Sequence, residues 1–368
     1  MARIMLLTSQ HTGRGHMSIA EALSEQFSRM DDVYLDMVDG FIFLGSQGVK
    51  SSKIYNVVTQ RARFVWKAVF KATNKGDFVP ETMGLLVNNR LTNYVRATRP
   101  DLILTVHPMF VGGVIDALEK GGLNVPVVCV EADIVNIHST WCDPRVAMAI
   151  CPTREAYDSS IALGMPKEKL TIIGFPTRAR FCDAARAMSV RKYDGSRPLH
   201  CLMTGGGGGA GDIEGYATAL LRGTDAHLTV ICGSNAKLRE RLTEKLGERY
   251  GARLRVLGFV TQMEEEYAKA DLVISRASPN CMFEAIVMAI PMVITGALPG
   301  QERDNPDFTL RHGLGVICAS PDELPGRIEA LTRDGAKLLG EIRRAQMAYR
   351  DLDSAKKVAE YVVGMIRG

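Results

Sequence analysis

The sequence predicts an α/β protein made of two doubly wound, Rossmann-like domains that face each other across a cleft. In each half of the 368-residue chain, short apolar strands alternate with amphipathic helices. Each half also opens with a strand that leads into a glycine-rich turn, at residues 13–15 and 205–211. A chain of this length commonly forms about two domains.

The first half begins with RIMLLT, an apolar run typical of a buried strand. A helix is expected from about Ser18 to Met30, and Pro100 separates another helix from the strand that follows it. Alternation of this kind predicts parallel strands joined by crossover helices. The remaining strands are predicted at 33–39, 101–108, 126–133, 147–153 and 169–176, and the remaining helices at 54–75, 112–121 and 154–164.

The second half repeats this architecture. Residues 182–198 lose the hydrophobic period and gain charge, which predicts a linker between domains 1–181 and 199–353. A last helix, 354–368, could cross back to the N-terminal domain. Strands are predicted at 200–205, 228–233, 253–259, 271–275, 291–296 and 314–320, with helices between them, among them 263–270 and 282–288.

Composition excludes several classes of protein. With 46% hydrophobic and 23% charged residues the chain is typical of a soluble globular protein, and a net charge of +4 is too small to indicate a nucleic-acid partner. Eight scattered cysteines without a CxxC pair predict buried, reduced thiols, a cytoplasmic location and no metal site. The first ten residues are expected to form a strand and not a signal peptide.

The two glycine turns are candidates for binding phosphate. Glycine allows backbone N–H groups to approach an anion, and a helix N-terminus favours negative charge; a plain flexible turn is the alternative. The first turn, with Asp36 about 20 residues later, partly matches a dinucleotide fingerprint. However, the third glycine is absent, and Arg14 and His16 are bulky where a pyrophosphate needs bare backbone. An NAD enzyme is therefore disfavoured.

Three polar features follow strands and have two interpretations each. His16 is either a helix-start residue bonded to backbone or a general base. Glu284, expected in the first turn of its helix, either complements the helix dipole or binds ribose hydroxyls. The loop with Gln301, Glu302, Asp304 and Asn305 is either solvated or binds a polyol.

A basic segment with aromatic residues lies in the first half. Residues 41–90 hold eight Lys or Arg and two acids, and an amphipathic basic helix with Trp and Phe favours an anionic membrane surface. The alternative is an ordinary helix packed on the sheet. We expect peripheral association with the inner face of the cell membrane. The residues expected at the membrane are Lys53, Arg61, Arg63, Trp66, Lys67, Phe70 and Lys71.

Four motifs resemble one enzyme family. They are GRGH at the first helix, DIVNIHSTW (residues 133–141), GFP before the linker and PGQERDN. Over nearly the whole chain the sequence resembles monogalactosyldiacylglycerol synthases and processive diacylglycerol glucosyltransferases, and more distantly the N-acetylglucosaminyltransferase of the peptidoglycan lipid precursor. The resemblance implies an inverting GT-B glycosyltransferase without metal or cofactor, with a UDP-sugar as donor and a membrane lipid, expected to be diacylglycerol, as acceptor.

The resemblance also implies roles for individual residues. His16 would be the base, with Asp133 as the alternative. The chain departs from the family at Ser278-Pro279-Asn280-Cys281, where a glycine-rich turn is usual, and at Glu131. The same plan could instead serve a UDP-sugar epimerase or hydrolase, or a non-catalytic nucleotide-sugar or lipid-binding protein. Donor-binding residues would be Gly206, Gly207, Gly208, Gly209, Phe259, Val260, Met263, Ser278, Asn280, Glu284, Gln301, Glu302 and Asn305, and acceptor-side residues Gly13, Gly15, His107, Pro108, His138 and Trp141.

Overall fold

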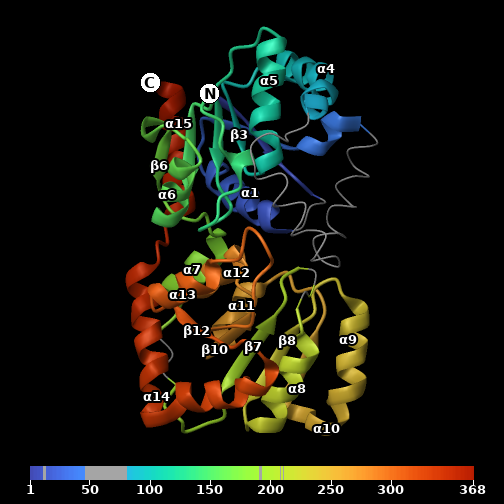
Figure 1. The fold of residues 1–368 in the computed structure, drawn as a ribbon, viewed down its shortest axis with the longest axis vertical. Helices are drawn as coiled ribbons and strands as arrows, with labels where there is room; N and C mark the ends of the chain where they lie inside the picture. The colour runs from blue at the N-terminus through green and yellow to red at the C-terminus, as the bar shows by residue number, and fades with distance from the viewer. Residues whose placement is uncertain (11–13, 46–80, 190–192, 208, 210) are drawn as a thin grey trace. The chain divides into compact units, whose positions relative to one another are not determined.

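The computed structural model confirms the predicted α/β fold class, with two six-stranded parallel sheets that are each covered by helices (Figure 1). The chain divides into two compact units. Unit 1 comprises Met1–Ala179, Pro299–Arg303 and Asp353–Gly368, and unit 2 comprises Arg180–Leu298 and Asp304–Leu352. The structure describes residues 1–10, 14–45, 81–189, 193–207, 209 and 211–368, with only the backbone at 81–88.

The sheet of unit 1 has the order β2-β1-β3-β4-β5-β6. Its inner strands are buried on both faces, which explains why they are continuous apolar runs in the sequence. The strands are β1 (Ala2–Thr8), β2 (Val33–Asp39), β3 (Leu102–Thr105), β4 (Val127–Val130), β5 (Met148–Cys151) and β6 (Leu170–Ile172). The helices are α1 (Arg14–Phe27), α4 (Glu81–Thr98), α5 (Gly112–Lys120), α6 (Arg154–Ala162) and α15 (Ser354–Arg367), with short 3-10 turns η1 (Gly40–Leu44), η2 (Pro108–Phe110), η3 (Ser139–Trp141) and η4 (Lys167–Lys169).

Helix α1 begins at Arg14, four residues earlier than the sequence pattern suggested. The apolar period becomes visible only at Ile19, the first fully buried residue of the helix, because the first turn carries the glycine and His16. His16 therefore lies inside the first turn of α1.

The C-terminal helix α15 is part of unit 1. It packs on α1, and Figure 1 shows this red helix beside the blue and green elements of that unit. Ser354 Oγ donates to the Phe175 carbonyl at 2.6 Å, and Arg367 forms an ion pair with Asp32. Both ends of α15 are thus tied to unit 1.

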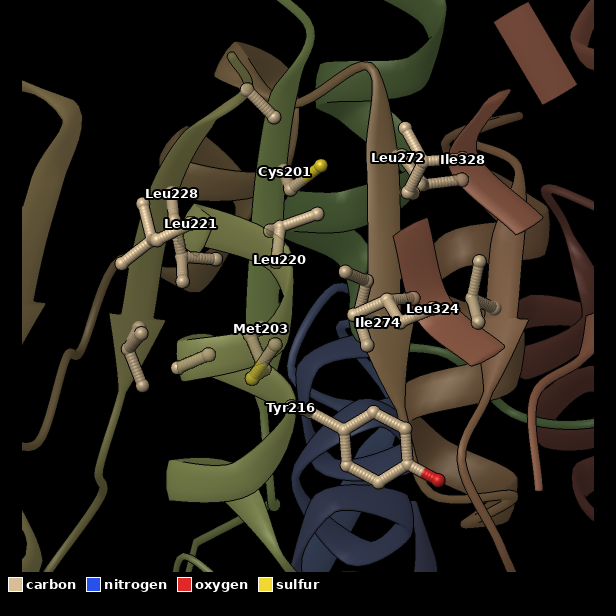
Figure 2. Close-up of a cluster of buried hydrophobic side chains, with 14 of the residues drawn as sticks. Cys201, Met203, Tyr216, Leu220, Leu221, Leu228, Leu272, Ile274, Leu324 and Ile328 are labelled. Atoms are coloured by element: carbon tan, nitrogen blue, oxygen red, sulfur yellow. The ribbon is translucent and has the colours of Figure 1, made fainter. Parts of the chain in front are cut away.

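The sheet of unit 2 has the order β12-β11-β10-β7-β8-β9. Its core lies between this sheet and helices that include α8 and the start of α14, where Tyr216, Leu220, Ile274 and Leu324 gather (Figure 2). The strands are β7 (His200–Thr204), β8 (His227–Ile231), β9 (Leu254–Leu257), β10 (Leu272–Ser275), β11 (Met292–Ile294) and β12 (Gly315–Ile317). The helices are α7 (Ala179–Ala187), α8 (Ile213–Gly223), α9 (Ala236–Leu242), α10 (Glu248–Tyr250), α11 (Met263–Lys269), α12 (Pro279–Val287), α13 (Asn305–Arg311) and α14 (Leu324–Tyr349), with shorter turns η5 (Thr243–Gly247), η6 (Gly251–Arg253) and η7 (Pro321–Glu323).

The segment 182–198, expected to be a linker, lies in unit 2 and begins inside helix α7. Phe181 packs edge-on against Tyr267 with ring centroids 5.4 Å apart, and Cys182 is buried. Tertiary packing therefore stabilises a helix as far as Ala187, because a helix of nine residues is too short to be stable by itself.

Candidate active site

Parallel strand ends bring the predicted acceptor residues of unit 1 to one edge of its sheet. Thr105 of β3 pairs with Leu7 of β1 and with Cys129 of β4, so these three strands end at one level. Ligand sites of doubly wound sheets lie at this carboxyl edge. The segments that follow carry His16, His107, and the stretch from Glu131 to Trp141.

His16 is oriented by a backbone hydrogen bond. Its Nδ1 lies 2.7 Å from the Val106 carbonyl oxygen, which can only accept, so Nδ1 carries the hydrogen and Nε2 keeps its lone pair. Burial lowers the pKa of His16 from 6.5 to about 4, although the bond to Val106 acts in the opposite direction. His16 is thus both bound to backbone and, at neutral pH, a neutral imidazole with a free acceptor nitrogen.

His107 supports the His16 ring. The two ring centroids are 4.4 Å apart, and His107 is fully buried between His16 and the rings of Phe41 and Phe110. Its Nδ1 accepts from the Met109 N–H at 3.3 Å, and burial, with a further contribution from His16, holds the pKa of His107 well below its usual range. The sequence does not single out Phe41, whose one signal is an aromatic residue two positions after the edge strand β2.

Asp133 is held by Trp141. The indole Nε1 donates to Asp133 Oδ2 at 2.9 Å, and the Trp141 ring centroid lies 6.2 Å from that of His16. Burial raises the pKa of Asp133 from 3.8 to about 7, which the Trp141 bond opposes and Glu302 reinforces. A carboxyl group that titrates near neutral pH, bonded to a tryptophan whose ring lies 6.2 Å from a neutral imidazole, is a pattern typical of acid–base chemistry.

Pro108 and His138 have structural positions in this site. Pro108 is the first residue of η2, where proline is favoured. His138 caps η3, since its Nδ1 accepts from the Thr140 N–H at 3.2 Å and lies 2.8 Å from Thr140 Oγ1. Gly15 lies in the first turn of α1.

Glu131 is a second buried carboxyl group, and the sequence marked it only as a departure from the family. It is completely buried at the end of β4, and Ser160 Oγ of α6 donates to Oε1 at 2.6 Å. Burial raises the pKa of Glu131 from 4.5 to about 8, and the Ser160 bond lowers it. Glu131 is therefore a neutral acid at pH 7 that ties the segment with Asp133 to α6.

The substitution Glu131→Gln is expected to stabilise the protein near neutral pH. The pKa of Glu131 is about 8 in the folded state and 4.5 in the unfolded state, so the folded state binds the carboxyl proton more tightly. The stabilisation that this proton provides is complete below pH 4.5 and is lost as the pH rises through 8. At pH 7 the cost of folding with Glu131 is about 3 kcal/mol, which glutamine avoids while still accepting from Ser160. Urea unfolding should show this gain at pH 7 and none at pH 4.

Glu168→Gln is a matched control, because it changes an exposed carboxylate of the same unit. Its effect on the free energy of unfolding should be equal at the two pH values. An equal effect of Glu131→Gln at both pH values would contradict the assignment of a buried, protonated Glu131.

The strands of unit 2 also end in one row. Ile294, Ser275, Thr204, Ile231 and Leu257 are register partners across five neighbouring strands. The loops after this row hold the glycine turn, the segment with Phe259, Val260 and Met263, and the turn that begins α12. Most of the predicted donor residues therefore lie along one edge of the sheet of unit 2.

The glycine turn leads into α8, whose N-terminus is already capped. Asp212 Oδ1 accepts from the Gly215 N–H at 3.0 Å, so a carboxylate occupies the end of the helix. A second anion there would be repelled. Any phosphate bound after β7 would therefore depend on the backbone of the turn itself.

Glu284 lies in the second turn of α12, and its predicted place in the first turn is wrong. The helix begins at Pro279, because proline is favoured at the first helical position, and Ser278 caps it without a side-chain bond. Glu284 is mostly buried, whereas Ser278 and Asn280 are partly exposed. Ser278-Pro279-Asn280 thus replaces a glycine turn with a proline-started helix.

The remaining donor candidates differ in exposure. Phe259 is 50% exposed, which leaves an aromatic surface for stacking, and Val260 and Met263 are partly buried. Asn305 is completely buried, and its Nδ2 donates to the Ala277 carbonyl at 2.9 Å. This hydrogen bond stabilises the turn before α12. Gln301 and the buried Glu302 belong to the segment Pro299–Arg303, which is part of unit 1.

Several predicted residues lie outside the described part of the chain. They are Gly13, Gly208 and the membrane residues Lys53, Arg61, Arg63, Trp66, Lys67, Phe70 and Lys71. Within the residues that the structure describes, none of the helices has the length and apolarity needed to cross a bilayer. The same residues contain no group of three or more His, Cys, Asp or Glu suited to hold a metal ion.

Comparison with known proteins confirms the resemblance seen in the sequence. Residues 16–177 match the family model of monogalactosyldiacylglycerol (MGDG) synthase, and residues 200–307 match the glycosyltransferase family 28 C-terminal domain. A probable monogalactosyldiacylglycerol synthase 2 of Oryza sativa subsp. indica is 29% identical over 343 residues, with 88% of this chain and 72% of the relative covered. A processive diacylglycerol beta-glucosyltransferase of Bacillus pumilus is 24% identical, with 91% and 88% covered.

Solved structures share the fold. MurG of Acinetobacter baumannii superimposes with a TM-score of 0.66 at 15% identity, with 99% of this chain and 100% of that chain covered. At this identity the likeness concerns the fold alone. It agrees with two Rossmann-like domains of the GT-B type.

Proposed function

This chain is a glycosyltransferase of the GT-B fold, and we propose that it transfers a hexose from a UDP-sugar to the hydroxyl group of a membrane lipid, diacylglycerol. The reaction is glycolipid synthesis. Unit 2 binds the UDP-sugar through the edge of its sheet, and unit 1 binds the lipid alcohol beside His16.

The observation that carries this proposal is the arrangement of His16. The Val106 carbonyl fixes the hydrogen on Nδ1, so the free Nε2 can take the proton from the acceptor hydroxyl. The acceptor oxygen then forms a bond to the anomeric carbon, the bond from that carbon to the diphosphate oxygen breaks, and UDP leaves with the electron pair. Direct displacement of this kind inverts the anomeric configuration.

In this proposal no metal ion takes part, and backbone N–H groups stabilise the negative charge of the departing diphosphate. Preorganised donors of this type act where charge develops, and the loss of one typically costs about 10²–10³ in rate. The glycine turn after β7 and the start of α12, where the Ser278 side chain makes no capping bond, supply such groups at neighbouring strands.

Two alternatives from the sequence are less favoured. A UDP-sugar epimerase or hydrolase and a non-catalytic binding protein would share the fold, but the relatives matched over 88–91% of this chain are by name a monogalactosyldiacylglycerol synthase and a diacylglycerol glucosyltransferase. The basic aromatic segment also serves no purpose in an enzyme with two water-soluble substrates.

The test is a transfer assay with each of three radiolabelled donors, UDP-glucose, UDP-galactose and UDP-N-acetylglucosamine. The purified protein is mixed with anionic vesicles that contain diacylglycerol, and the lipid product is identified by mass. We expect one hexosyl lipid and an equal amount of UDP. Release of free sugar or of an epimer, with no labelled lipid, would overturn the proposal.

We expect the chain to bind anionic vesicles through the basic segment 50–75. Each Lys or Arg near such a surface contributes about 1 kcal/mol. Lys67→Gln combined with Lys71→Gln should therefore weaken co-sedimentation with anionic vesicles roughly 30-fold, and high salt should weaken the wild type similarly. Equal binding to neutral and anionic vesicles would contradict this.

A matched control removes two other lysines. Lys167→Gln combined with Lys169→Gln eliminates the same charge from η4, at a turn between α6 and β6. Its vesicle binding should equal that of the wild type.

A further inference from the structure

A second turn of unit 2 holds the glycine turn in place. Residues 232–235 follow β8, the strand next to β7, and were not marked by any motif in the sequence. The Ser234 N–H donates to the Gly207 carbonyl at 3.0 Å, and Ser234 Oγ donates to the same oxygen at 3.1 Å. One carbonyl of the glycine turn thus accepts two hydrogen bonds from the 232–235 turn.

The two turns also meet backbone to backbone. Gly233 has φ +58°, and a Cβ added there would lie 2.4 Å from the Gly207 oxygen and 3.0 Å from the Gly206 oxygen. In return, a Cβ on Gly209 would lie 2.6 Å from the Cys232 oxygen. Contacts this short exclude any side chain, and backbone atoms cannot rotate away as a flexible side chain would. Glycine is required on both sides.

We propose that Gly233 and Ser234 are positioning residues for the diphosphate of the donor, because they hold the glycine turn in the conformation that binds it. A run of glycines loses much conformational entropy when it is ordered, so a turn of this kind needs an external template. Each peptide unit is planar, so fixing the Gly207 carbonyl fixes the orientation of the whole peptide plane. Oriented N–H groups bind the anion without reorganisation.

This inference depends on the proposed function for the identity of the anion. The substitution Gly233→Ala is therefore tested with UDP and with uridine, by calorimetry on the whole protein. Uridine lacks the phosphates, so its affinity reports on the rest of the nucleotide site. We expect Gly233→Ala to weaken the binding of UDP at least tenfold and to leave the affinity for uridine unchanged. Ser234→Ala removes the hydroxyl bond but keeps the bond from the Ser234 N–H to the Gly207 carbonyl, and it should weaken the binding of UDP about 2- to 5-fold.

Gly251→Ala is the matched control. Gly251 also has a positive φ, +46°, but a Cβ there meets nothing within 4 Å. Alanine at this position would also have to adopt a positive φ, but without a contact to the glycine turn. Its melting temperature should fall in a similar way, while its affinities for UDP and uridine stay at the wild-type values.

Three results separate the possibilities. If Gly233→Ala binds UDP as the wild type does, the positioning role is overturned. If Gly233→Ala weakens the binding of UDP and of uridine equally, the substitution has disrupted the fold of unit 2 as a whole, and the positioning role is again overturned. If the wild type does not bind UDP, the proposed function fails first.

Discussion

The substitution His16→Ala is expected to reduce lipid glycosylation about 10²- to 10⁴-fold, the usual range for loss of a general base. The rate falls because the variant lacks the Nε2 atom that accepts the hydroxyl proton. The fold is retained because the His16 side chain is only partly buried at the start of α1. The fold and the affinity for UDP should therefore remain. Steady-state transfer, circular dichroism and calorimetry with UDP measure these three properties.

His227→Ala is the control for this experiment. His227 is an exposed histidine at the start of β8, at the opposite edge of the sheet from the glycine turn. Its transfer rate should equal that of the wild type. If His16→Ala retains most of the transfer activity, another group takes the proton, and Asp133 is the candidate.

Asp133 is expected to set the acid limb of the pH–rate profile. Burial raises its pKa to about 7, so the carboxylate is progressively protonated below that pH. The protonated group no longer has the negative charge that stabilises the imidazolium formed when His16 takes the hydroxyl proton. The value of kcat/KM should therefore rise with pH through about 7. Protonation of His16, with a pKa of about 4, would place the acid limb three pH units lower.

The variant Asp133→Asn should lower kcat/KM about 10²-fold and abolish the limb near pH 7. Asparagine keeps the bond from the Trp141 indole, so the geometry of the site is preserved while the charge is removed. A remaining activity that is flat down to pH 5 would support this assignment. An unchanged limb near pH 7 in the variant would show that a different group titrates there.

Much of the fold was predictable because its signals are local. The inner strands are apolar on both faces and their crossover helices are amphipathic, so the alternation is visible in short windows of sequence. The edges of elements were less predictable. Helix α1 starts at Arg14 and α7 continues to Ala187, because burial against partners distant in sequence, such as Tyr267 for Phe181, makes these segments helical.

The site was predictable in residue identity but not in chemistry. His16, Asp133 and Trp141 were named from motifs, and the structure places their side chains together. The roles of Glu131, Phe41 and Gly233 were not visible, because each depends on a neighbour far away in the chain. Glu131 is bonded to Ser160, 29 residues later, and Gly233 fits against Gly207.

By itself, the sequence determined the two parallel sheets, the glycine-rich segments after their first strands and the resemblance to a family of glycosyltransferases, since these follow from short periodic patterns and motifs. Only the tertiary structure decided which nitrogen of His16 is free, which carboxyl groups titrate near neutral pH and what supports the glycine turn. Hydrogen positions and pKa values depend on burial and on partners such as Val106, which lies 90 residues from His16. Such partners meet only when the chain is folded.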